Sequence, residues 1–396
     1  MQRQFVEDFT RPPKQSIVLL CDWLPPDFGA VGQYTLQRGY ELADAGHDVT
    51  VVGFSSEQRP TEDKPVGAGR LRIRFVHRGA YDKRSLLQRA FWSLSANLVL
   101  LRAAFSYLRA ADEVVFTGSP PFLLHFIAPL NLLLRRNLVY RITDFHPECL
   151  MAEYQKVPMA LRLLHQATLF WRRRISTFEV LGHDQAARLI AQGFASSRIR
   201  LVRDPSPVSI TAETIPMSLP AALAGRKVLL YSGNFGVAHD APTIIAALSE
   251  TETTHPGQMG VWLNAVGSKA DEVESQLRAR GVLVHRSKPV ALSELPALLK
   301  APHAHLISLR DGFVGYVLPS KVYACIASGL PVLYVGSAES DVHLLCATAH
   351  GAQRYQRVSV GDVEGAHQAL ITLLNLRETP NPPAGLAKIS QPNLTT

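Results

Sequence analysis

Paired cysteines and long apolar runs are both scarce in this chain of 396 residues. Its four cysteines, Cys21, Cys149, Cys325 and Cys346, are scattered, and no CxxC pair occurs. This spacing argues against a metal site and against a disulfide framework. We therefore expect free thiols in a reducing compartment.

No apolar run reaches the roughly 18 residues that a bilayer-spanning helix needs. The longest, PPFLLHFIAPLNLLL from Pro120 to Leu134, contains a histidine, a proline and an asparagine, and two arginines follow it. Two interpretations stay open: a buried helix, or a helix that dips into an anionic leaflet with its arginines at the headgroups. The N-terminal stretch MQRQFVEDFTRPPKQ lacks the apolar core of a secretory signal, so we expect a cytoplasmic location.

Charged residues make up only 19% of the chain, against 47% hydrophobic residues, which is enough apolar material for two cores. The formal net charge of +8 favours an anionic partner. Neither zinc-finger spacing nor the aromatic-basic pattern of an RNA-binding sheet is present. We therefore expect a nucleotide phosphate or an anionic membrane surface, and no nucleic acid.

The first half of the chain alternates short β-rich runs with helical patterns. A strand at 16–21, a helix at 33–45 closed by Gly46 and a strand at 48–54 predict a parallel unit with a right-handed crossover. A long helix is predicted at 86–110. Further strands are predicted at 72–76, 113–117, 138–142, 177–181 and 200–203.

The second half repeats this alternation after a stretch, 204–225, that holds four prolines and reads as a linker. Strands are predicted at 227–232, 261–266, 282–285, 305–309 and 331–335, with a helix at 320–328. We therefore predict an α/β protein of two doubly wound, Rossmann-like domains, 1–204 and 205–378, facing a central cleft, and a loose tail at 379–396. Ligands of such sheets bind beyond the carboxyl ends of the strands.

The start of the predicted helix at 320–328 is the strongest candidate phosphate site. Pro319 and Ser320 begin this helix, and amides exposed at a helix N-terminus bind anions. Lys321 and Arg310 would neutralise charge on a departing diphosphate. The alternative is an ordinary helix start beside a solvated lysine.

Glycine-containing loops after several strands are further candidates for donor binding. Glycines at such places let the backbone approach a phosphate or a sugar, although a tight turn explains each one about as well. The pattern is not GxGxxG, which counts against NAD. The candidate residues are Gly29, Gly32, Ser232, Gly233, Asn234, Gly236, Gly267 and Gly315.

Two carboxylates and an imidazole follow the predicted strand at 138–142, in the segment TDFHPE. Asp144 or His146 could contact an acceptor hydroxyl and act as a general base. The alternative is that Asp144 and Glu148 cap the next helix.

These stretches together resemble the GT-B glycosyltransferases, and among them the family 4-like enzymes of bacterial capsule, O-antigen and exopolysaccharide assembly. The resemblance rests on WLPPDFGAVGQYTLQRGYELADAGHDVTVV, TDFHPE, LLYSGNFG and GYVLPSKVYACIASGLPVL, which occur in order between about residues 16 and 375. It implies two Rossmann-like domains, of which the N-terminal one binds the acceptor and the C-terminal one the nucleotide sugar.

The resemblance also implies a chemistry and a place. Family 4 enzymes retain anomeric configuration and need no metal, so stabilisation of the leaving group would fall to Arg310, Lys321 and the glycine-loop amides. The acceptor would be a polyprenyl-diphosphate-linked saccharide. The enzyme would then associate peripherally with the cytoplasmic face of the inner membrane, whose surface is anionic.

The sequence departs from the family pattern at three places. Ala324 stands where most members carry a ribose-contacting glutamate, and Tyr316 stands where the first glutamate of that spaced pair falls. Ala238, His239 and Asp240 replace the usual basic residue after the glycine loop. Two alternatives therefore stay open beside a transferase: a non-catalytic subunit that binds a glycan lipid or another transferase, and a nucleotide-sugar epimerase.

Overall fold

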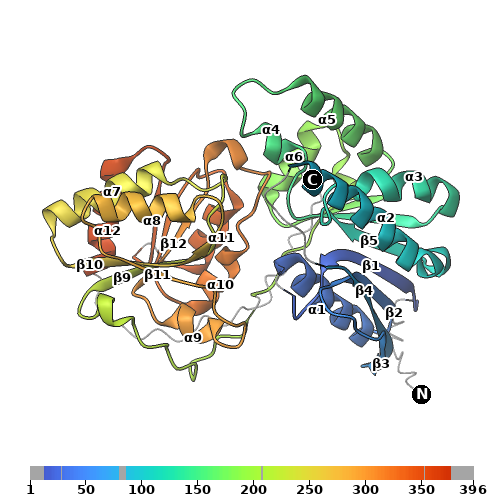
Figure 1. Cartoon of the computed structure of the whole chain (residues 1–396), viewed down its shortest axis with the longest axis horizontal. Coiled ribbons are helices and arrows are strands. Elements are labelled where there is room, and N and C mark those ends of the chain that lie inside the picture. Colours follow the sequence, from blue (N-terminus) through green and yellow to red (C-terminus); the bar gives the residue numbers. More distant parts are fainter. Residues whose placement is uncertain (1–12, 28, 80–85, 207, 352, 376–396) are drawn as a thin grey trace, which may run out of the picture. The chain divides into compact units, whose positions relative to one another are not determined.

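The computed structural model describes residues 13–27, 29–79, 86–206, 208–351 and 353–375 (Figure 1). The tail predicted at 379–396 lies outside these residues. The chain forms two compact units. The first comprises the chain up to His146 with Arg162–Glu179 and Arg198–Arg200, and the second comprises Pro147–Leu161, Val180–Ser197 and the chain from Leu201 onward. The predicted boundary between residues 204 and 205 stays a prediction.

An eight-stranded sheet, in the order β3-β4-β2-β1-β5-β6-β7-β8, contains the strands of the first half. The pairs β4–β2, β2–β1, β1–β5 and β5–β6 are parallel, as predicted. The strands are β1 (Ser16–Trp23), β2 (Asp48–Ser55), β3 (Glu62–Val66), β4 (Gly69–His77), β5 (Glu113–Thr117), β6 (Asn137–Ile142), β7 (Thr177–Val180) and β8 (Ile199–Leu201).

Helix α1 packs on one face of this sheet, where Ala43 joins Leu19, Val51 and Ile73 in a buried cluster. A right-handed crossover places helices that connect strands in the opposite direction on the other face. Those helices are α2, α3 and α5. The helices of this half are α1 (Ala30–Asp44), α2 (Leu86–Ala110), α3 (Leu124–Leu134), α4 (Glu148–Met151), α5 (Met159–Arg172) and α6 (His183–Ala191).

Strand β3 is an element that the sequence pattern does not predict. It pairs antiparallel with β4 at the edge of the sheet. Its sequence, EDKPV, is polar and contains a proline, which suits an edge strand whose outer side needs no partner.

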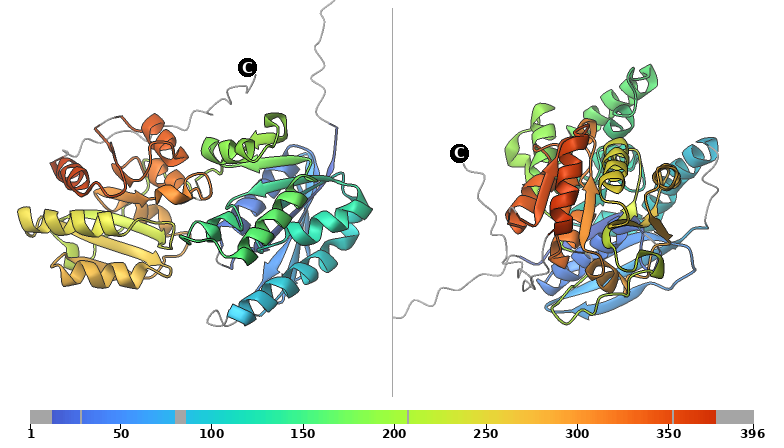
Figure 2. Two further views of the ribbon diagram at one scale, coloured as in Figure 1. Left: turned by 90° about the horizontal axis from the view of Figure 1, so that it is seen from above. Right: turned by 90° about the vertical axis from the view of Figure 1, so that its left-hand side faces the viewer.

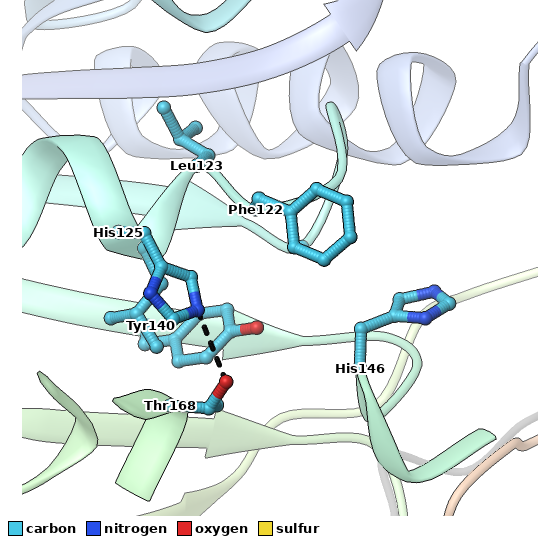
Figure 3. Close-up of a pocket in the computed structure, with 8 residues that line it drawn as sticks. Phe122, Leu123, His125, Tyr140, His146 and Thr168 are labelled. Carbon is cyan, nitrogen blue, oxygen red and sulfur yellow. Dashed lines mark hydrogen bonds between the residues drawn. The ribbon is translucent and has the colours of Figure 1, made fainter. Parts of the chain in front are cut away.

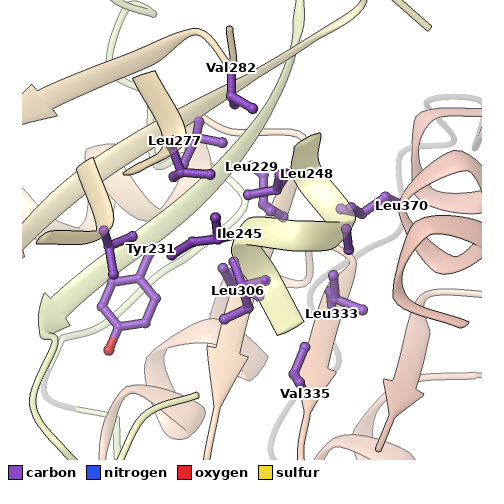
Figure 4. Packing of buried hydrophobic residues seen from close by; sticks show 14 of the residues in the cluster. Leu229, Tyr231, Ile245, Leu248, Leu277, Val282, Leu306, Leu333, Val335 and Leu370 are labelled. Atoms are coloured by element: carbon purple, nitrogen blue, oxygen red, sulfur yellow. The ribbon is translucent and has the colours of Figure 1, made fainter. Parts of the chain in front are cut away.

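A six-stranded, parallel sheet in the order β11-β10-β9-β12-β13-β14 forms the centre of the second unit. On one face, Leu229, Leu306 and Leu333 pack against Ile245, Leu248 and Leu370 from the helices (Figure 4). The strands are β9 (Lys227–Asn234), β10 (Met259–Val266), β11 (Val284–Ser287), β12 (Ala304–Ser308), β13 (Val332–Val335) and β14 (Tyr355–Val358). The helices are α7 (Pro242–Thr254), α8 (Ala270–Ala279), α9 (Leu295–Lys300), α10 (Lys321–Ser328), α11 (Asp341–Ala349) and α12 (Val363–Asn375).

The apolar run at 120–134 forms a helix only over Leu124–Leu134. Leu124, Ile127 and Ala128 are buried, whereas Leu133 at its end is 82% exposed. Among the described residues, no helix combines the length and the hydropathy that crossing a bilayer requires.

Candidate functional site

The candidate donor site lies at the carboxyl edge of the second sheet, where β9 and β10 end side by side. Gly233 pairs with Ala265, and Asn234 pairs with Val266. The hydrogen bonding between the two chain segments extends one residue beyond β9, because the amide of Phe235 donates to the carbonyl of Val266 at 2.6 Å. The predicted loops Ser232–Gly236 and Gly267 are therefore neighbours. A β-carbon on Gly267 would overlap the side chain of Asn234.

Lys321, the first residue of α10, extends its side chain toward the end of β9. Its Nζ lies 3.2 Å from the centroid of the Tyr231 ring. A β-carbon placed on Gly233 would lie 3.9 Å from this Nζ. The structure thus brings together the two strongest predicted features, the helix start and the glycine loop.

The ammonium of Lys321 is buried without a hydrogen-bond partner among the described residues, although the residue as a whole is only half-buried. Burial lowers the pKa of Lys321 to about 7. A buried cation without an acceptor is costly, and an anion that supplied acceptors there would offset that cost. The buried ammonium of Lys321 therefore favours the binding of an anionic group.

His239, like Lys321, contacts the ring of Tyr231, and sequence reasoning assigned it no role. Its Nδ1 lies 2.7 Å from the carbonyl oxygen of Ser308, and its ring meets the Tyr231 ring edge-on at 5.7 Å. Burial, and after it the charge of Lys321, lowers the pKa of His239 to about 3. This imidazole is neutral at pH 7 and can contact a ligand only as a neutral donor or acceptor.

The start of α10 differs from the prediction in its backbone. The amide of Val322 donates to the carbonyl of Pro319 at 3.0 Å, and that of Tyr323 donates to Ser320 at 3.3 Å. These two amides are not free for a phosphate, because the helix opens with a tight turn. Ser320 stands at the N-cap position, yet its side chain makes no capping hydrogen bond. For binding an anion, the Nζ of Lys321 therefore contributes more to this site than these two helix amides do.

Arg310 is exposed and hydrogen-bonded to the two residues that follow the glycine loop. Its amide donates to Ala238 at 2.9 Å, and its Nη1 donates to the carbonyl of Val237 at 3.1 Å. The remaining guanidinium N–H groups can still reach an anion.

Gly315, in the loop before α10, is held by α6 of the same unit. Arg188 donates from Nε and Nη2 to the carbonyl of Val314 at 3.1 and 2.9 Å, and its guanidinium lies 4.5 Å from the centroid of the Tyr316 ring. Gly315 has a φ of +75°, and a β-carbon there would lie 2.7 Å from the carbonyl oxygen of Asp184. Glycine is required at this position by backbone geometry and by α6.

Two of the three departures from the family pattern lie at packed positions. Ala324 is 5% exposed and packs in an apolar cluster with Leu230 and Trp262, so this position offers a ligand no polar group. Tyr316 packs under Arg188.

Asp144 and His146 lie in the first unit, after β6. Burial raises the pKa of Asp144, and the neighbouring His146 lowers it in part. Helix α4 has no side-chain cap, so the alternative role as a cap is not seen. His146 lines a small pocket with Phe122, His125 and Thr168, in which His125 Nε2 lies 3.0 Å from the Thr168 hydroxyl (Figure 3).

Asp22, at the end of β1, is a residue that sequence reasoning missed. Its Oδ1 is buried and has no hydrogen-bond partner among the described residues. Burial raises its pKa, and the Ser119 side chain lowers it in part. A carboxylate directly after a buried strand is the signal that could have identified it, by the same logic that selected Asp144.

Gly29 and Gly32 also belong to the first unit. Gly29 precedes α1 and has room for a side chain. A β-carbon on Gly32 would overlap the carbonyl oxygen of Trp23, so close packing of α1 on β1 already explains this glycine. Among the described residues, no cluster of histidine, cysteine, aspartate or glutamate side chains is suited to hold a metal.

Comparisons with known proteins match this architecture. No family model matches the chain. It is 30% identical over 127 residues to a putative colanic acid biosynthesis glycosyl transferase, WcaI, of Escherichia coli (strain K12). That alignment spans 32% of this chain and 30% of the relative.

Solved structures resemble the chain over nearly its whole length. WaaG, a glycosyltransferase involved in lipopolysaccharide biosynthesis, matches with a TM-score of 0.58 and 15% identity over 91% of this chain and 90% of its own. OtsA matches at 0.60 and 13% over 92% of each chain. Anabaena HepE, solved in complex with UDP and glucose, matches at 0.60 and 14% over 91% of this chain and 90% of its own. The chain therefore has the GT-B fold of glycosyltransferases, as its sequence predicts.

Proposed function

We propose that this protein is a glycosyltransferase that moves a sugar from a nucleotide sugar to a saccharide acceptor in cell-surface polysaccharide biosynthesis. The observation that carries the proposal is the buried Lys321 ammonium, which has no hydrogen-bond acceptor in the described part of the chain and adjoins the β9 glycine loop. The donor diphosphate is an anion of suitable charge for this place. The likeness to HepE, which was solved with UDP and glucose, supports a nucleotide ligand.

In this proposal the second unit binds the donor. Lys321 pairs with a diphosphate oxygen, and Ser232, Gly233, Asn234, Gly236 and Gly267 shape the edge on which the donor lies. Arg310 approaches the same anion from the loop after β12. Pro319, Ser320 and Gly315 set the path of the chain into α10.

The first unit binds the acceptor, with Asp22, Asp144 and His146 as the polar groups that contact its hydroxyls. Burial raises the pKa of both aspartates, which favours proton exchange with a hydroxyl over permanent charge. The WcaI relationship supports a saccharide acceptor of a surface polysaccharide.

We further propose that the reaction retains anomeric configuration and proceeds without a metal. The resemblance to family 4 supports both points. Lys321 and Arg310 would stabilise the developing charge on the leaving diphosphate in place of a cation. The acceptor would be lipid-linked, and the enzyme would work at the inner membrane surface.

The test is a screen of nucleotide sugars for thermal stabilisation, since a ligand that binds only the native state raises the midpoint of unfolding. We expect at least one nucleotide sugar to stabilise the wild type and to leave Lys321→Ala unchanged. Lys227→Ala, at the opposite end of β9, is the matched control and should behave as wild type. If no nucleotide sugar binds the folded wild type, the proposal fails in favour of a non-catalytic subunit. If a bound donor is isomerised without an acceptor, the protein is an epimerase.

A further inference from the structure

Helix α2 of the first unit carries a stripe of exposed apolar side chains. Leu94, Leu98 and Phe105 are 50%, 59% and 42% exposed. Their spacing of four and seven residues places all three on one face of the helix. The core-facing side, with Leu100, Ala104 and Leu108, is buried.

Arginines continue the same stripe. Arg102 and Arg109 follow Leu98 and Phe105 by four residues each, and both are exposed. No aspartate or glutamate occurs in the sequences of α2, α3 or α5. The outer surface of these helices is therefore apolar and basic, with no acidic side chain of its own.

Helix α3 extends this surface on one side of α2. The Nη2 of Arg136, just after α3, donates to the carbonyl of Arg109 at 2.5 Å, which fixes the two helix ends together. Leu132 and Leu133 at that end are 56% and 82% exposed, and Arg135 follows them. The stripe on α2 thus continues onto a second helix.

Helix α5 lies beside α3, as the contact between His125 and Thr168 shows (Figure 2). Its Leu163 and Phe170 are 64% and 46% exposed. The guanidinium of Arg174 stacks 3.6 Å from the centroid of the Phe170 ring. Here too a large apolar side chain is paired with an arginine.

We propose that this surface docks on a bilayer that contains anionic phospholipids. We define the docking face by Leu94, Leu98, Arg102, Phe105 and Arg109 on α2 and by Leu132, Leu133 and Arg135 on and after α3. The apolar side chains enter the boundary between headgroups and acyl chains, and the guanidinium groups meet lipid phosphates. Within these three helices no carboxylate repels an anionic surface.

The docking face refines the membrane interpretation of the run at 120–134. Leu124, Ile127 and Ala128 belong to the core, so this run does not dip into the membrane as a whole. Only the last turn of the run, with Leu132 and Leu133, is exposed. The other apolar side chains of the docking face belong to the stripe on α2. The inference deepens the proposed function, because it names the surface that would bring the enzyme to a lipid-linked acceptor.

The experiment is co-sedimentation of the full-length protein with vesicles of phosphatidylglycerol and phosphatidylethanolamine, compared with pure phosphatidylcholine. We expect binding to the anionic vesicles, weakened by potassium chloride. Arg102→Glu with Arg109→Glu should lower the partition coefficient by more than tenfold, since each arginine near such a surface contributes about fivefold. Leu94→Ser with Leu98→Ser should lower it as well.

Two controls lie in the second unit, namely Arg280→Glu, just after α8, and Ile215→Ser, both at exposed positions. Both should bind vesicles as the wild type does. The inference would be overturned by wild-type protein that does not bind anionic vesicles, or by docking-face variants that bind them as well as the controls do. Nucleotide-sugar stabilisation is measured on the wild type and on every variant. A wild type that binds a nucleotide sugar but not anionic vesicles refutes the docking face alone. Loss of donor binding in the wild type refutes the proposed function instead.

Discussion

Lys321 is the residue on which the donor site depends, and its burial predicts a conflict between stability and binding. Its pKa in the folded protein is about 7, below the ordinary value of 10.5. Folding therefore disfavours the charged form, and the resulting destabilisation is present at pH 7 and disappears as the pH rises past the ordinary value. Lys321→Met keeps the apolar stem and removes the charge.

We expect Lys321→Met to raise the free energy of unfolding at pH 7 by about 2 kcal/mol or more, while nucleotide-sugar binding is lost. Urea denaturation of both proteins, with Lys227→Met as the control, measures the first effect. A Lys321→Met protein that is less stable than the wild type would show that the lysine stabilises the free protein.

The same lysine predicts how donor binding depends on pH. An anion beside Nζ raises its pKa, so donor binding takes up a proton wherever the free lysine is neutral. Affinity for UDP-glucose, or for whichever nucleotide sugar the screen selects, should fall as pH rises from about 6.5 to about 8.5. Lys321→Arg, which stays charged throughout, should bind with a flatter profile. Calorimetric titration across this range measures both, and equal slopes would contradict a role for Lys321 protonation.

At the scale of elements, helix α6 fixes the loop that leads into α10. Arg188→Ala removes two hydrogen bonds to the Val314 carbonyl and the contact with the Tyr316 ring. We expect a loss of about 1–3 kcal/mol in stability and a weaker affinity for the donor, because the loop before Lys321 loses its support. Arg188→Lys should restore only part of this, since an ammonium cannot donate from two nitrogens. Thermal denaturation and donor titration of both variants decide the point.

The regular elements were predictable from the sequence wherever an apolar pattern reports burial. Helix α2 and strand β5 have the predicted bounds, since a long helical pattern and a short β-rich run leave few alternatives. Strand β3 escaped prediction because its residues are polar and its pairing is set by β4. The closed first turn of α10 and the buried Nζ of Lys321 depend on tertiary contacts, which no local pattern encodes.

For the whole molecule, the order of strands and helices in both halves predicted two parallel α/β sheets, and the solved GT-B structures match over 91% of the chain or more. Function was harder to predict from the sequence than the fold, because one fold supports several activities and the residues of the site determine which of them occurs. Ala324 illustrates the limit: the sequence shows that a glutamate is missing, and only the structure shows that the position lies in an apolar cluster.

Sugar transfer itself shows whether this protein is a glycosyltransferase. The protein is incubated with the radiolabelled nucleotide sugar that the screen selects and with bacterial membranes that carry lipid-linked saccharides. We expect label to enter the lipid-extractable fraction with wild-type protein and with Lys227→Ala, and Lys321→Ala to transfer almost none. Transfer by Lys321→Ala at the wild-type rate, or no transfer by a wild type that binds the donor, would contradict this expectation.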